Sequence, residues 1–134
     1  MSDTGLVKHT GGCHCRAVTW EIQAPSTLSI DECNCTICEM KGFQHLIVPR
    51  TRFALLTGGD NIATYTFNTG VAQHYFCKTC GVQSYYVPRS NPDGFSVNFR
   101  CLDKASVVDA RIVPFDGRSG WEAGAKKLAH LSKD

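Results

Sequence analysis

The 134-residue sequence lacks a long apolar run, because polar or charged residues interrupt every hydrophobic stretch within a few positions. A membrane-spanning helix needs about 20 consecutive apolar residues, so we expect no membrane partner. The amino-terminal segment also lacks the apolar core and the small-residue cleavage site of a secretory signal. The sequence therefore predicts a protein of the reducing cytoplasm or nucleus.

Runs of like charge are absent as well. The 14 basic and 12 acidic residues give a formal net charge of +2 and are spread along the chain. Domains that bind nucleic acids concentrate Lys and Arg on one face, so the composition predicts no nucleic-acid partner. The chain also has no internal repeat and no linker rich in Pro, Gly or Ser, and its length suits one domain over residues 1–134.

Short alternating segments separated by turn residues are what the sequence does contain. Val18, Trp20 and Ile22 alternate with other residues, as do Phe95, Val97 and Phe99, and this period is typical of strands with one buried face. Further strands are expected at 45–48, 52–56, 63–67, 73–76, 84–87 and 111–115. Residues 119–122 match a capping box, and Trp121, Ala125, Leu128 and Leu131 recur at helical spacing. The sequence predicts an all-β or β-rich antiparallel domain with a carboxy-terminal helix.

Seven of the eight cysteines form three tight groups. Thiolates are preferred zinc ligands, and a reducing compartment disfavours disulfides. In Cys77-Lys78-Thr79-Cys80-Gly81 two thiolates converge on one metal, while Gly81 permits a left-handed backbone. Cys13 and Cys15 would project to one side of an extended segment and supply the second pair. We therefore expect a structural zinc ion on Cys13, Cys15, Cys77 and Cys80.

The middle group, Cys33, Cys35 and Cys38, supplies only three ligands. Three protein ligands with an exchangeable fourth are typical of a zinc site that meets substrate, so these residues are predicted to be catalytic. Three thiolates make the metal a weak activator of water and suit a soft thiol ligand better. Cys101 could close the site as a fourth ligand, although a lone buried cysteine also behaves as a small hydrophobic residue.

Other interpretations of the cysteines fit less well. A disulfide scaffold needs an oxidising compartment, and a zinc nucleobase deaminase needs His-x-Glu before Pro-Cys-x-x-Cys. A thioredoxin-like role needs a surrounding βαβ pattern. Among the histidines, His74 is a general base only if it lies within about 3 Å of an incoming thiol. His14 is expected to point away from the metal, and His9, His45 and His130 to be structural or solvated.

Four segments taken together resemble the glutathione-dependent formaldehyde-activating enzyme family, with the zinc domain of centromere protein V as the nearest likeness. They are Gly11-Gly12-Cys13-His14-Cys15, Cys33-Asn34-Cys35-Thr36-Ile37-Cys38, Tyr65-Thr66-Phe67-Asn68 and Phe76-Cys77-Lys78-Thr79-Cys80-Gly81, and the likeness spans about residues 9–130. The resemblance implies a zinc fold of the Mss4-like type, with zinc ions on the two cysteine sets given above. It also implies a carbon–sulfur lyase that, in the reverse sense, joins glutathione or another small thiol to formaldehyde or a related small aldehyde. A non-catalytic zinc module that binds glutathione or a protein partner, as in chromatin-associated centromere protein V, would look the same in sequence.

Two residues depart from the family pattern. Arg16 stands where the family commonly has glycine, and a positive φ there would cost an arginine about 1 kcal/mol. We expect Arg16 to be a solvated surface charge, although it could attract a glutathione carboxylate. Glu39 follows Cys38 where relatives often carry a basic residue, which makes the rim of the second site less attractive to an anionic tripeptide.

Overall fold

The computed structural model describes residues 5–67, 70–116, 125–126 and 128–133, and strands dominate it, as predicted. The strands are β1 (Leu6–Gly12), β2 (Thr19–Pro25), β3 (Thr27–Cys33), β4 (Gln44–Pro49), β5 (Phe53–Thr57), β6 (Ile62–Tyr65), β7 (His74–Cys77), β8 (Tyr85–Tyr86), β9 (Gly94–Asn98) and β10 (Asp109–Phe115). Between the strands lie a short helix, α1 (Thr36–Lys41), and the 3-10 turns η1 (Arg50–Arg52), η2 (Phe99–Cys101) and η3 (Lys104–Ser106), and the 3-10 turn η4 (Ala129–Ser132) follows β10.

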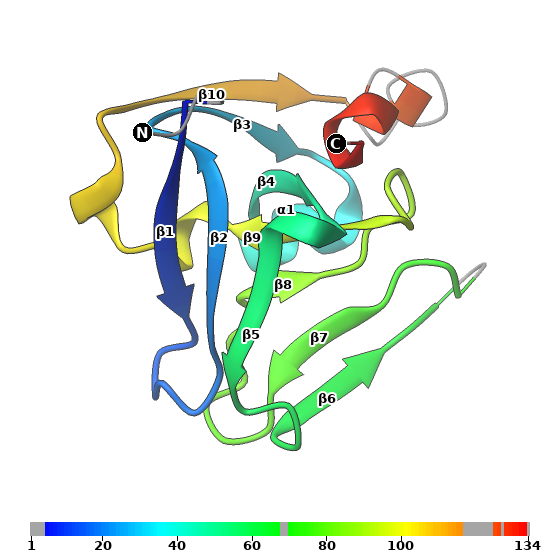
Figure 1. Ribbon diagram of the computed structural model, residues 1–134. Coiled ribbons are helices and arrows are strands. Elements are labelled where there is room, and N and C mark those ends of the chain that lie inside the picture. The colour runs from blue at the N-terminus through cyan, green and yellow to red at the C-terminus, as the bar shows by residue number, and fades with distance from the viewer. Residues whose placement is uncertain (1–4, 68–69, 117–124, 127, 134) are drawn as a thin grey trace.

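The strands form three sheets. Their orders are β1-β2-β5, β10-β3-β4-β9-β8 and the hairpin β6-β7. In Figure 1, β1 and β2 lie side by side, β3 and β10 run together across the top, and the β6-β7 hairpin lies at the opposite end. The expected antiparallel arrangement is wrong for one pair, because β10 runs parallel to β3, with Asp109 opposite Thr27 and Phe115 opposite Cys33. The connection from β9 to β10, which contains η2 and η3, is long enough for the chain to cross the sheet and enter β10 in the same direction as β3.

The core lies between the first two sheets and follows the alternation seen in the sequence. Val18, Trp20 and Ile22 are at most 2% exposed, and Val97 is fully buried. Burying a large aromatic side chain stabilises a small domain strongly, but an indole N–H needs a partner there. The Trp20 Nε1–H donates to Ser84 Oγ at 3.0 Å, which meets that need.

Gly11 and Gly12 end β1 because nothing larger fits. A Cβ atom on Gly11 would lie 2.5 Å from the Trp20 ring and 2.6 Å from the Cys101 carbonyl oxygen. A Cβ atom on Gly12 would lie 2.4 Å from the Val18 carbonyl oxygen. This close packing fixes where the β1–β2 turn begins, and with it the place of Cys13.

The predicted carboxy-terminal helix falls largely outside the described residues, including its capping box and Trp121. The part that is described ends in η4, which packs against β4. The Asn91 side chain donates to the Leu128 carbonyl oxygen at 2.9 Å and to Ser132 Oγ at 3.0 Å, so it attaches this segment to the sheet. In the described part of the chain, no helix has the length and apolar character needed to cross a membrane.

Candidate metal sites and cavity

Four cysteines meet where the β1–β2 turn approaches the turn after β7. The sulfur atoms of this four-cysteine cluster, Cys13, Cys15, Cys77 and Cys80, all lie within 4.8 Å of one another. The Cys15 sulfur is 3.7 Å from that of Cys13 and 3.6 Å from that of Cys77. Tetrahedral zinc with 2.3 Å bonds would place its sulfur ligands about 3.8 Å apart. The cluster predicted from spacing is therefore assembled and could hold a metal ion.

The backbone at Cys13 and Cys15 is a turn, so the extended segment expected there is wrong. The Arg16 N–H donates to the Cys13 carbonyl oxygen at 3.2 Å, and the Cys13 N–H donates to the Val18 carbonyl oxygen at 3.0 Å. Arg16 has a φ of 66°, in the left-handed region that favours glycine. The departure from the family's glycine therefore carries strain, while the Arg16 side chain is exposed as expected.

Backbone N–H groups point at the sulfur atoms of this cluster. The N–H groups of Val18 and Thr79 donate to the sulfur atoms of Cys13 and Cys77 at 3.4 and 3.3 Å. Gly81 has a φ of 75°, which confirms the left-handed turn predicted after Cys80. Hydrogen bonds to a thiolate favour its charged form, the form that binds metal.

The other three cysteines meet at the junction of β3 and α1. Cys33 ends β3, Cys35 is the N-cap residue of α1, and Cys38 is buried within that helix. The three sulfur atoms lie within 4.8 Å of one another and form the three-cysteine cluster. Gly42, with a φ of 66°, ends the helix by donating its N–H to the Glu39 carbonyl oxygen at 3.3 Å. A metal ion could bind here with one coordination position left over.

Hydrogen bonds among the three thiols of this cluster shift their pKa values in opposite directions. Hydrogen bonds from the thiols of Cys33 and Cys38 hold the pKa of Cys35 well below its usual range. Hydrogen bonds with Cys33 and Cys35, followed by burial, raise the pKa of Cys38. A bound cation would favour the ionised form of all three thiols.

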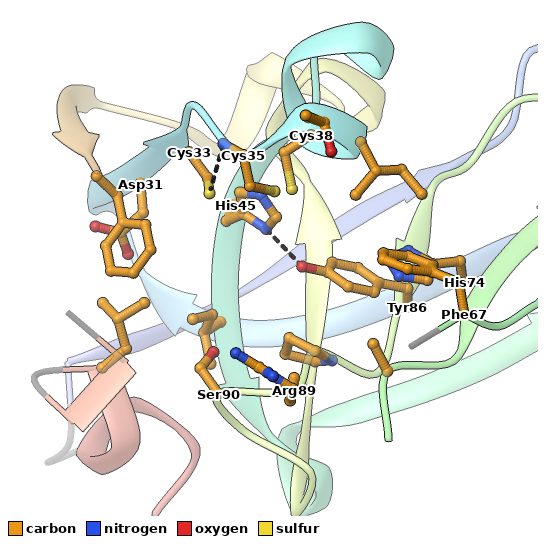
Figure 2. Close-up of a pocket in the computed structure, with 17 residues that line it drawn as sticks. Asp31, Cys33, Cys35, Cys38, His45, Phe67, His74, Tyr86, Arg89 and Ser90 are labelled. Carbon is orange, nitrogen blue, oxygen red and sulfur yellow. Dashed lines mark hydrogen bonds between the residues drawn. The ribbon is translucent and has the colours of Figure 1, made fainter. Parts of the chain in front are cut away.

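A cavity of about 250 Å³ opens next to the three-cysteine cluster. Figure 2 shows the three cysteines at one end of the cavity and Arg89 and Ser90 at the other, with Asp31 on one side and His74, Phe67 and Tyr86 on the opposite side. Of the two clusters in the described residues, the three-cysteine cluster is the one whose sulfur atoms line this cavity.

His45 lies directly under the three-cysteine cluster (Figure 2) and was missed as a site residue from sequence. Its Nδ1 is 3.1 Å from Ser96 Oγ and 3.3 Å from the Tyr86 hydroxyl, and burial lowers its pKa to about 3. Burial, followed by the charges of the three cysteines, raises the pKa of Tyr86 well above 10, and its hydroxyl is hydrogen-bonded to Cys38. Both side chains are therefore neutral at pH 7. The predicted strand at 45–48 contained His45, but no periodicity indicated which cluster it would face.

His74 also lines this cavity and contacts Lys41, and no sequence pattern indicated that contact. Its Nδ1 lies 3.1 Å from Lys41 Nζ, and Lys41 also donates to Gln83 Oε1. The lysine ammonium lies 5.7 Å from the centre of the Phe43 ring and 5.4 Å from that of Tyr86. Burial, reinforced by the nearby Lys41 charge, lowers the pKa of His74 to about 4, so the ring is neutral at pH 7.

Cys101 is not brought to the three-cysteine cluster. It lies in η2, on the side of Cys13 and Cys80, and its thiol faces the Gln83 carbonyl oxygen at 3.9 Å. Burial raises its pKa to about 11. Within the described residues Cys101 belongs to neither cluster, which leaves its role as a small, largely buried side chain.

His9 and His130 agree with their expected places as structural or solvated residues. His9 is fully buried, with Nδ1 at 2.6 Å from Ser106 Oγ and Nε2 at 2.9 Å from the Pro25 carbonyl oxygen, so it joins β1 to its neighbours. His14 and His130 are exposed.

Comparison with known proteins decides the family. The sequence model of the glutathione-dependent formaldehyde-activating enzyme family matches residues 8–115 of this chain. The chain belongs to this family. The family is described by the glutathione-dependent activation of formaldehyde. Both cysteine clusters lie within the matched residues. Among solved structures, a protein of Rhodobacter sphaeroides from a structural genomics programme is 28% identical, with a TM-score of 0.64, over 76% of this chain and 99% of that one. The Rhodobacter sphaeroides protein therefore shares the fold of this chain over almost its full length.

Proposed function

We propose that this protein adds a thiol such as glutathione to formaldehyde or a related small aldehyde, as a zinc-dependent carbon–sulfur lyase of the S-hydroxymethylglutathione synthase type. One observation carries the proposal beyond family membership: the three-cysteine cluster, with one metal position left over, lines a cavity of about 250 Å³. The cytoplasmic or nuclear location expected from sequence stays a prediction.

The donor sets fit zinc at both clusters. Cys13, Cys15, Cys77 and Cys80 would hold a structural ion, and Cys33, Cys35 and Cys38 would hold a second one. When bound by three thiolates, zinc would supply a soft position that suits the thiolate form of an incoming thiol better than it suits water.

The walls of the cavity support a thiol substrate of the size and charge of a small peptide. Arg89, half-buried at the end away from the cysteines, presents a planar guanidinium of the kind that recognises carboxylates. Lys41 Nζ places a positive charge beside the three-cysteine cluster, and the nearby Cys38 and Cys35 partly offset the lowering of its pKa by burial. The aromatic rings of Tyr86 and Phe67 exclude water from one side of the cavity. These residues hold and orient the thiol so that the aldehyde meets it in one geometry.

Formaldehyde consumption at equal glutathione concentrations, with and without the zinc-loaded protein, tests the proposal. Thiol addition to formaldehyde already runs in water, so the measured quantity is the increase in rate above that background. We expect a clear increase with wild-type protein and none with Cys38→Ser, which removes one ligand of the three-cysteine cluster. An unchanged rate despite measurable glutathione binding would leave the non-catalytic binding module as the function.

X-ray absorption at zinc tests the exchangeable position separately. The average number of sulfur ligands per zinc should be below four without thiol and should rise when glutathione is added. Four sulfur ligands at both sites before any thiol is added would require Cys101 to move to the three-cysteine cluster, and the open site would have to be abandoned.

A further inference from the structure

His74 has one ring nitrogen whose partner is known and one whose partner is missing. The ring is held between Phe67, at 5.5 Å and 24°, and Tyr86, at 4.9 Å and 16° between rings, so its plane is fixed. Nδ1 contacts Lys41 Nζ at 3.1 Å. Nε2 is buried and makes no hydrogen bond with any described residue.

The Lys41 contact decides which nitrogen of His74 carries the proton. An ammonium group has three donors and no acceptor, so Nδ1 must accept from Lys41. The Gln83 Oε1 acceptor and the two aromatic rings beneath the ammonium are further partners suited to a cation. The neutral imidazole therefore carries its proton on Nε2, which makes Nε2–H a buried donor, on a residue that lines the cavity, with no acceptor among the described residues.

This tautomer is opposite to the one that a general base would need. A base would offer a lone pair on Nε2 to the incoming thiol, whereas His74 offers a proton. A buried donor left without a partner destabilises the protein, so its arrangement calls for an acceptor on the ligand. Such a ligand atom is the oxygen of a small carbonyl compound.

We propose that His74 is a catalytic residue whose Nε2–H donates a hydrogen bond to the aldehyde oxygen as the thiolate adds, and that Lys41 is the positioning residue that fixes this tautomer. The inference rests on the proposed function. The thiolate sulfur forms a bond to the carbonyl carbon, and the carbon–oxygen π bond breaks with its electron pair moving to oxygen. That oxygen, hydrogen-bonded to Nε2–H, takes a proton from water, and the proton that the thiol released to water on ionising completes the balance.

The fixed position of the ring supports this role. A neutral imidazole that is already held in one tautomer needs no rearrangement when negative charge develops on the aldehyde oxygen. The low pKa of His74 keeps it neutral throughout the physiological range. His45, the other buried histidine of the cavity, has hydroxyl groups at its Nδ1, which can donate or accept, so its tautomer is not fixed in the same way.

Two isosteric variants separate the two ring nitrogens. The side-chain amide of His74→Gln can place an N–H near the position of Nε2, whereas that of His74→Asn can place an acceptor near Nδ1 for Lys41 and leaves no donor at Nε2. We expect His74→Asn to lower kcat by about 100-fold, the loss typical of removing one oxyanion donor, and His74→Gln to recover much of it. The dissociation constant for glutathione and the zinc content should be unchanged in both.

A spectroscopic measurement tests the tautomer without relying on turnover. The imidazole 15N resonances of His74 in the zinc-loaded protein should report a protonated Nε2 and an unprotonated Nδ1. Lys41→Met should give a mixture of tautomers and lose about 10-fold in kcat with little change in glutathione affinity. In wild-type protein, adding formaldehyde to the glutathione complex should shift the Nε2 resonance, whereas glutathione alone should not.

The outcomes distinguish this inference from the proposed function. Wild-type acceleration with full activity in a folded, zinc-loaded His74→Asn variant would overturn the role of His74 and leave the proposed function standing. A protonated Nδ1 in wild-type protein would overturn it as well. Absence of any wild-type acceleration would overturn both.

Discussion

The four-cysteine cluster should control folding, and Cys80→Ser is the perturbation that shows it. The cluster joins the β1–β2 turn to the end of β7, so it connects the sheet β1-β2-β5 to the hairpin β6-β7. Cys80 itself is only partly buried, so the exchange of sulfur for oxygen costs little in packing. The effect of the substitution therefore acts through the metal.

The expected magnitude is large compared with the stability of the fold. A structural zinc ion with thiolate ligands contributes of order 10 kcal/mol to folding in small domains, whereas such domains are stable by only about 5–15 kcal/mol in total. Loss of most of that contribution leaves the folded state marginal. We expect Cys80→Ser to be unfolded, or to melt at least about 20 °C below the wild type, because each kcal/mol shifts the melting temperature of a domain this size by several degrees.

The assay uses the same Cys→Ser change at three places. Cys38→Ser should lose the metal of the three-cysteine cluster, while Cys101→Ser, outside both clusters, should keep the zinc content of the wild type. Both should still melt cooperatively, because the two clusters share no residue. Zinc per chain and circular dichroism melts give the answer. If Cys80→Ser retained a native spectrum and a cooperative melt after complete metal removal, the structural role of this cluster would be refuted.

Three further predictions follow from local geometry. Arg16→Gly should stabilise the protein by up to about 1 kcal/mol, since it relieves a φ of 66°, and a lower urea midpoint for the variant would contradict this. Gly94→Ala should destabilise by about 1–3 kcal/mol, because its Cβ would lie 2.6 Å from both the Ser132 Cβ and the Val48 carbonyl oxygen; an unchanged melting temperature would show that the carboxy-terminal segment yields easily. Burial lowers the pKa of His74 to about 4 in the folded protein, whereas the unfolded chain binds this proton near pH 6.5. The stability of the fold should therefore decrease as the pH drops from 6.5 to 4, by up to about 1.4 kcal/mol per pH unit. The stability of His74→Asn should fall less over that range. If urea melts at pH 7 and pH 5 gave the same loss of unfolding free energy for the variant and the wild type, the assignment would be contradicted.

The strands that could be predicted from sequence are those whose pattern shows one buried face. Trp20 and Val97 lie in such segments, and both are fully buried. β1 and β3 were not among the expected strands, although Gly11 and Gly12 complete β1 by packing against Trp20. The parallel pairing of β10 with β3 could not be predicted, because alternation indicates a strand but not its direction. The single domain over residues 1–134 stays a prediction.

The cysteine clusters could be predicted because metal ligands on one turn have characteristic spacings. The cavity could not, since its walls come from separate elements: His45 lies on β4, His74 on β7 and Tyr86 on β8. No local period relates these positions, and only the fold brings them together. The same holds for Cys101, whose distance from the three-cysteine cluster depends on where η2 lies rather than on its neighbours in sequence.

The charge near the three-cysteine cluster depends on more than the residue that follows Cys38 in sequence. Glu39 follows Cys38 directly, and on that ground the rim of the site was expected to repel an anionic tripeptide. On a helix, however, residues three apart share a face and adjacent residues do not. Lys41, three residues after Cys38, places its ammonium beside the cysteines and His74, whereas Glu39 lines a second groove that Cys33 and Cys38 also border, together with Gly42, Pro114 and Asp116. The cluster therefore lies near a charge of each sign, and that of Lys41 opposes the repulsion expected from Glu39.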